Sequence, residues 1–136
     1  MRFLFRPVPQ RNTRQRALIE AVLHASDRPL TRQEIHALAR QSQPRIGFAT
    51  VSRAVNDLLD SGQVVRLQYP GQPDRYEKAS AREHPHLLCN HCAKIFDLPL
   101  AMPKVNLPRA EGYTLNGYEV LFFGECRKPA TCPHRK

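Results

Sequence analysis

Two pairs of cysteines constrain this chain of 136 residues more than any other feature. Cys89 and Cys92 enclose two residues in HPHLLCNHC, and Cys126 and Cys132 enclose five in GECRKPATC. A chain this short builds a small hydrophobic core, so a metal ion bound by its own side chains would stabilise it. Four thiolates suit one tetrahedral zinc ion and leave it no open position for chemistry. The cysteines therefore predict a structural zinc site, in which the second pair has the looser spacing.

Disulfides and two kinds of enzyme are the alternatives for these cysteines. The start, MRFLFRPVPQ, has no apolar stretch long enough for a signal peptide, and no later segment could span a membrane, so we predict a cytoplasmic protein with reduced thiols. A thioredoxin-like pair would open a helix, whereas AKIFDLP after CNHC is typical of a strand. A zinc deaminase would need a His-x-Glu motif, which the chain lacks. We therefore expect no enzymatic activity.

Positive charge is concentrated at the N-terminus of the chain. The formal net charge is +9, and residues 1–16 contain no acidic residue. The arginines of this arm are Arg2, Arg6, Arg11, Arg14 and Arg16. Such an arm is typical of a protein that binds a polyanion, although many small basic proteins bind no nucleic acid.

Apolar residues recur at helical spacing in three segments, TRQRALIEAVLHA, TRQEIHALARQ and the part of PRIGFATVSRAVNDLLDSG that precedes its last glycine. Thr13 is the predicted N-cap of the first helix. Thr31 and Glu34 predict a capping box at the second, and Gly62 is expected to end the third. The predicted apolar faces consist of Leu18, Ala21, Val22 and Ala25, of Ile35, Leu38 and Ala39, and of Val51, Val55, Leu58 and Leu59.

The next segment, QVVRLQYPGQPDRYEK, alternates with a period of two on both sides of a Pro-Gly loop and predicts a β-hairpin. Three helices followed by a hairpin, behind a basic arm, indicate a winged helix-turn-helix, whose third helix enters the DNA major groove. On that helix Ser52, Arg53 and Asn56 could contact base edges, while the wing and arm contact phosphates. The alternative is that these residues form an ordinary solvated helix face.

The polar segment KASAREH predicts a boundary between two domains. We expect a DNA-binding domain with its basic arm at 1–78, a linker at 79–83 and a second domain at 84–136. In the second domain CNHC lies between the strand-like stretches HLL and AKIFDL, as in a zinc knuckle.

Taken together, these segments resemble the ferric uptake regulator family of bacterial metal- and peroxide-responsive repressors. The matching stretches are TRQR, FATVSRAVNDLLDSGQVVR, RYE, HPHLLCNHC, KIFDL and GEC, and they lie in family order between about residue 11 and residue 132. The resemblance implies an α+β fold, with an N-terminal winged helix-turn-helix domain followed by a small α/β dimerisation domain that contains a zinc site. It implies a homodimeric repressor that binds a palindromic DNA operator, with a divalent metal as corepressor and no small-molecule substrate.

The resemblance also assigns individual residues. It places structural zinc on the four cysteines, and a regulatory Fe(II), Mn(II) or Zn(II) on Glu77, His84, His86 and Asp97. Imidazole and carboxylate ligands suit those metals, and a site with ligands on both sides of the linker could set the angle between the domains. The remaining histidines are expected to be ordinary surface or helix residues. The predicted DNA contacts are Arg11, Arg16, Thr50, Ser52, Arg53 and Asn56.

The chain departs from the family pattern at several positions. Pro29 stands where the family usually has a regulatory histidine, and Gly117 and Tyr118 stand near the place of another, which argues against an accessory metal site. Ser52 replaces a usual tyrosine, so the operator preference should differ. Prolines in the segment 98–112 imply that the family's helix there is short or broken.

The sequence does not identify the signal that is sensed. The absence of a fifth cysteine favours iron or manganese over a zinc sensor with a thiolate regulatory ligand. A peroxide sensor that oxidises its histidines at Fe(II) is one alternative. A constitutive zinc-ribbon protein, which binds nucleic acid without metal regulation, is the other.

Overall fold

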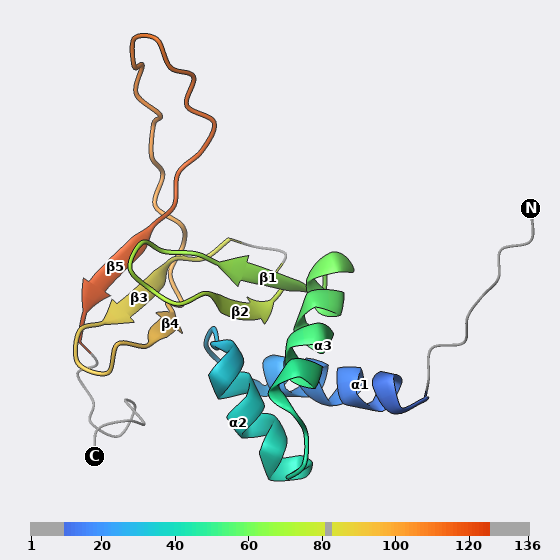
Figure 1. Ribbon diagram of the computed structural model, residues 1–136. Helices are drawn as coiled ribbons and strands as arrows, with labels where there is room; N and C mark the ends of the chain where they lie inside the picture. Colours follow the sequence, from blue (N-terminus) through green and yellow to red (C-terminus); the bar gives the residue numbers. More distant parts are fainter. Residues whose placement is uncertain (1–9, 81–82, 126–136) are drawn as a thin grey trace, which may run out of the picture. The chain divides into compact units, whose positions relative to one another are not determined.

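The computed structural model describes residues 10–80 and 83–125 (Figure 1). The chain divides into two compact units, Met1–Ala79 and Ser80–Lys136. This division falls in the polar segment for which the sequence predicts a linker. No helix in the described ranges is long and apolar enough to cross a membrane.

The first unit has the order of elements expected of a winged helix-turn-helix (Figure 1). Its two strands pair antiparallel, with Val65 opposite Glu77, and an isolated bridge joins Leu30 to Tyr76. Three helices followed by a hairpin confirm the predicted fold of this part. The elements are α1 (Gln10–Ala25), α2 (Arg32–Ser42), α3 (Phe48–Asp60), β1 (Val64–Leu67) and β2 (Arg75–Lys78).

The buried face of α1 is not the predicted one. Ile19 and Leu23 are buried, whereas Ala21 and Ala25 are exposed and the other two residues of the predicted face are only partly buried. This helix has apolar side chains at adjacent positions, so periodicity alone allows two overlapping faces. Packing against the other two helices and β2 selects the face whose larger side chains bury more apolar area.

The other two helices follow the prediction more closely. Ile35 and Ala39 of α2 are buried, but Leu38 lies at the edge of that face and is 37% exposed. On α3 three of the four predicted residues are buried, and Leu59 is partly buried against the core. Ala54, which the sequence analysis did not include, is also buried. The core consists of Ile19, Leu23, Leu30, Ile35, Ala39, Ile46, Val51, Ala54, Val55, Leu58, Val64 and Tyr76.

Two of the three predicted helix ends are confirmed. Gly62 has a φ of 74°. Its N–H donates to the Leu59 carbonyl, and the Gln63 N–H donates to the Leu58 carbonyl. This arrangement is a Schellman motif. The expectation for Thr13 is wrong, because α1 begins at Gln10 and Thr13 lies inside it. Good helix formers such as glutamine and arginine precede it, so the helix continues past the polar residue toward the N-terminus.

The predicted capping box at the start of α2 is present. Thr31 Oγ1 accepts a hydrogen bond from the Glu34 N–H at 3.2 Å, and Glu34 Oε1 accepts one from the Thr31 N–H at 3.5 Å. Glu34 also forms an ion pair with Arg28. Burial lowers the pKa of the Arg75 guanidinium, and the Glu34 carboxylate opposes that shift. The capping box therefore fixes the start of α2, and its Glu34 carboxylate also offsets the positive charges of Arg28 and Arg75.

Thr31→Ala should lower the free energy of unfolding by about 1 kcal/mol, because one helix-terminal N–H loses its acceptor. Chemical denaturation of the zinc-loaded protein would measure the change. Thr13→Ala is the matched control: Thr13 is exposed inside α1, and its loss should change stability by less than about 0.5 kcal/mol. Equal effects of the two substitutions would contradict a capping role for Thr31.

The second unit contains a three-stranded sheet in the order β4-β3-β5, made of β3 (His86–Cys89), β4 (Ile95–Asp97) and β5 (Leu121–Gly124). β3 pairs antiparallel with β4 and parallel with β5. The segment 98–120 contains no helix and extends from the sheet as a long loop (Figure 1). The sequence analysis expected a helix that is short or broken in this segment, and the structure goes further and has none, since proline removes a backbone donor.

Candidate functional site

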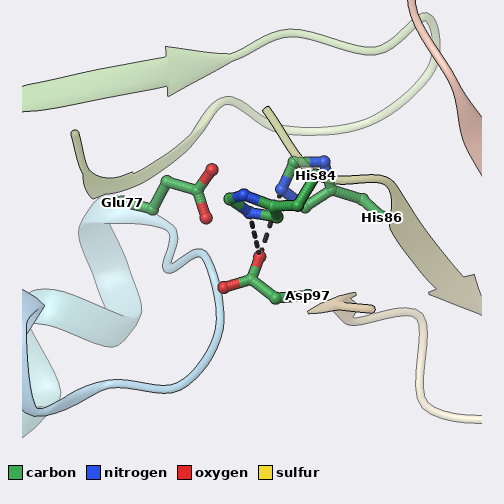
Figure 2. Close-up of side chains that lie close together, drawn as sticks. All are labelled: Glu77, His84, His86 and Asp97. Carbon is green, nitrogen blue, oxygen red and sulfur yellow. Dashed lines mark hydrogen bonds and ion pairs between the residues drawn. The ribbon is translucent and has the colours of Figure 1, made fainter. Parts of the chain in front are cut away.

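The second unit brings two histidines and a carboxylate together (Figure 2). His84 and His86 are two residues apart, which places both side chains on one face of an extended segment. The β3–β4 register sets Asp97 directly opposite His86. The Nε2 atoms of both histidines lie 3.1 Å from Asp97 Oδ1, and the ring centroids are 4.7 Å apart. Asp97 of β4, His86 of β3 and His84, two residues before β3, thus converge on one point.

This cluster suits a divalent transition metal. One ligand atom of each of His84, His86 and Asp97 lies within 4.8 Å of the others, and the His86 side chain is only 7% exposed. Two imidazoles and a carboxylate are a ligand set that Mn(II), Fe(II) and Zn(II) accept. A coordinating imidazole must present a lone pair, so a metal ion would replace the hydrogen bonds to Asp97. The donor set therefore fits the regulatory metal that the resemblance implies.

Glu77, the fourth predicted ligand, belongs to the first unit. It lies on β2, opposite Val65 of β1, and Figure 2 labels it with the other three residues. Pro29 also belongs to the first unit, is fully buried and has no ligand atom in its side chain.

The first cysteine pair lies on the turn between β3 and β4, as predicted from its flanking sequence. Cys89 ends β3 and is buried, and Cys92 is half-buried. The Ala93 N–H donates to the Cys89 carbonyl at 2.8 Å, and the Cys89 N–H donates to the Lys94 carbonyl at 3.0 Å. These bonds fold the turn around the two thiols.

β5 leads the chain toward the same turn. Gly124 is the register partner of Cys89, and its carbonyl accepts from the Asn90 N–H at 2.8 Å. Cys126 follows Gly124 by two residues, which is about 7 Å of extended chain. Cys126 and Cys132 themselves lie outside the described residues. The parallel pairing of β5 with β3 is therefore compatible with a site that uses both cysteine pairs.

Several predicted DNA contacts gather where α1 meets α3. Arg16, Thr50, Arg53 and Asn56 line one hollow of about 250 Å³. Arg53 and Asn56 are exposed, and Arg53 Nη2 lies 3.5 Å from Thr50 Oγ1. Another predicted contact, Arg11, has its side chain outside the described part of the structure. The hollow shows that four of the six predicted residues share one surface.

Ser52 faces a residue that the sequence analysis did not single out. Arg32, the first residue of α2, donates hydrogen bonds to the Ser52 and Asn56 side chains. The signal that could have identified it is its position: a cation in the first turn is unfavourable to the helix dipole, which indicates another role for the side chain.

The other described histidines do not belong to the metal cluster. His36 Nε2 lies 2.9 Å from the Ile46 carbonyl, and its ring meets Phe48 edge-on, which is a packing role. His24 is exposed on α1 and lies 3.9 Å from Glu20, while His91 is an exposed residue of the cysteine turn.

Sequence comparison finds relatives of this chain among known metal-uptake regulators. The model of the ferric uptake regulator family matches residues 9–121. The ferric uptake regulation protein of Campylobacter jejuni is 28% identical over 119 residues, which cover 84% of this chain and 76% of that protein. The zinc uptake regulation protein of Mycobacterium tuberculosis is 29% identical over 119 residues, covering 85% and 92%.

A solved structure supports the fold. The Helicobacter pylori ferric uptake regulator aligns with a TM-score of 0.61 and 23% identity, over 90% of this chain and 82% of that one. The family model covers most of the sequence, and the resemblance seen in its motifs is confirmed. The chain belongs to the ferric uptake regulator family and is a metal-responsive transcriptional regulator rather than an enzyme.

Proposed function

We propose that this protein represses transcription as a homodimer on a palindromic DNA operator, with a divalent metal bound at His84, His86 and Asp97 as corepressor. The observation that carries the proposal is the convergence of two imidazole Nε2 atoms on one oxygen of Asp97, each at 3.1 Å. Such a cluster of nitrogen and oxygen donors binds a metal without the closed, all-thiolate geometry of a structural zinc.

Glu77 is proposed as the fourth ligand. Only six residues separate it from His84, and that connection spans at most about 25 Å, so Glu77 is within reach of the cluster. A metal bound to both units would favour one angle between them. Two recognition helices of a dimer enter adjacent major grooves only when they lie about 34 Å apart, so one angle would favour operator binding.

The choice of metal follows from the donor atoms. The proposed set has nitrogen and oxygen ligands and no thiolate, which favours Fe(II) or Mn(II), although Zn(II) also accepts it. Relatives are named for the uptake of iron and of zinc, and one solved structure of similar fold is a zinc-bound manganese uptake regulator. Because Pro29 offers no ligand, we expect weaker binding than in a site with an additional histidine.

We propose structural Zn(II) on Cys89, Cys92, Cys126 and Cys132. The buried Cys89, the half-buried Cys92 beside it and the arrival of β5 at the same turn support this assignment. Four thiolates complete a tetrahedral zinc, so this site would stabilise the unit and leave the sensing of metal to the histidine cluster.

Selection from a pool of random-sequence duplex DNA tests the function. With zinc retained in the cysteine site, the protein should enrich an inverted repeat when Mn(II) or Fe(II) is present, and bind it at least tenfold more weakly after chelation of that metal. Light scattering should show a dimer. Enrichment of no sequence would contradict DNA regulation, and equal binding with and without added metal would identify a constitutive binder.

A further inference from the structure

A single arginine holds two groups on the exposed side of the proposed recognition helix. Arg32 Nη1 donates to Ser52 Oγ at 2.6 Å and to the Ser52 carbonyl at 2.9 Å, and Nη2 donates to Asn56 Oδ1 at 2.8 Å. All of these residues lie in the first unit. The guanidinium therefore bridges the start of α2 to the middle of α3.

A buried tyrosine fixes the position of that guanidinium. Arg32 Nε donates to the hydroxyl of Tyr76 at 3.0 Å, and the guanidinium carbon lies 4.8 Å from the centre of the Tyr76 ring. Tyr76 is 2% exposed and belongs to β2, so its ring cannot move aside without opening the core. Three nitrogen atoms of Arg32 thus have defined acceptors, which orients the planar group.

The orientation of the Asn56 amide follows from this contact. A guanidinium has only donors, so the atom of Asn56 that faces it must be the carbonyl oxygen. The amide nitrogen then points away from Arg32, on a side chain that is exposed. Asn56 consequently presents two N–H donors at the helix surface, while one lone pair of its oxygen is engaged by Arg32.

We infer that Arg32 determines base specificity by holding Asn56 as a hydrogen-bond donor. An unrestrained asparagine reads adenine with both atoms, donating to N7 and accepting from the N6 amino group. With its oxygen turned toward Arg32 and its nitrogen pointing away, Asn56 mainly offers donors and matches an edge that offers acceptors, which is guanine N7 and O6 or thymine O4. The inference rests on the proposed DNA-binding function and names a positioning residue for it.

The test measures base preference at each position of the half-site selected from random-sequence duplex DNA. Asn56→Ala should identify the position that Asn56 reads, where the wild type should prefer guanine or thymine. Arg32→Ala should raise the relative affinity for adenine at that position by about tenfold, because a restored bidentate contact has about that effect. The double variant should behave like Asn56→Ala alone, since the two residues act as one unit.

Two further variants separate specificity from folding and from charge. Arg32→Met keeps an unbranched apolar stem over the Tyr76 ring and removes every donor, so it should shift preference as Arg32→Ala does even if the alanine variant unfolds. Arg40→Ala removes an exposed arginine from the same helix, and should weaken binding to all sequences equally or leave it unchanged. Thermal unfolding of each variant would be recorded alongside.

The results distinguish the possibilities. Wild-type preference for adenine at the Asn56 position would overturn the inference, as would unchanged preference in both Arg32 variants. A uniform loss of affinity in these variants, equal to that of Arg40→Ala, would show a phosphate contact only. No altered preference in Asn56→Ala would also overturn it. If the wild type selects no sequence with any metal, the proposed function fails and this inference fails with it.

Discussion

Cys89→Ser is expected to release zinc from the protein and to unfold its second unit. Cys89 is 0% exposed and ends β3, the central strand of a sheet of only three strands. Structural zinc contributes on the order of 10 kcal/mol to the folding of small domains, which is comparable with the whole stability of an ordinary domain. Serine is a poor zinc ligand, so this one substitution should have the largest effect of any proposed here.

Metal analysis and circular dichroism of the full chain would measure this result. The wild type should retain about one zinc per chain after purification, as expected for one closed four-thiolate site. Cys126→Ser should lose it like Cys89→Ser, whereas Asn90→Ser, at an exposed position of the same turn, should keep both metal and fold. A stable wild-type dimer without zinc, or a disulfide between Cys89 and Cys92 under reducing conditions, would refute the assignment.

Replacing both His84 and His86 with alanine should abolish the dependence of DNA binding on added metal. The double variant leaves Asp97 without the two imidazoles that approach it in this structure. If the metal raises operator affinity about a hundredfold, linkage requires equally tighter metal binding on DNA, a coupling of about 2.7 kcal/mol. Loss of two ligands should remove that coupling while the cysteine zinc stays in place.

Titrations of operator binding with Mn(II), Fe(II) and Zn(II) would compare the two proteins. His24→Ala is the control, because it removes an exposed imidazole of α1 that is not part of the cluster. Full metal dependence in the double variant, with its structural zinc intact, would show that the regulatory assignment is wrong. If the wild type needs no added metal either, the proline at position 29 has left a site too weak to regulate.

Features specified by neighbouring residues were predictable from the sequence. The capping box of Thr31 and Glu34 and the left-handed Gly62 each depend on a few adjacent residues, whose hydrogen bonds close within one turn. The hairpin and the turn at Cys89 follow in the same way from period-two alternation and turn residues. The prolines of the segment 98–112 likewise predicted locally that a helix there is short or broken, and the structure has none.

The ligand residues were predictable in part and for a different reason. Glu77, His84, His86 and Asp97 were assigned through the family resemblance, since no local pattern joins residues twenty positions apart. Their assignment as ligands stays a proposal. The convergence of three of them depends on the register of β3 and β4, because a shift by one residue would turn Asp97 to the opposite face.

By itself, the sequence determined the order of the three helices and the hairpin, the start of the second helix and the end of the third, and the family. Only the tertiary structure decided which face of α1 is buried, and that Arg32 holds Ser52 and Asn56. Those residues are 20 and 24 positions from Arg32 along the chain. Contacts at such separations arise when whole elements pack to bury the largest apolar area, and that choice depends on all the elements together rather than on any local pattern.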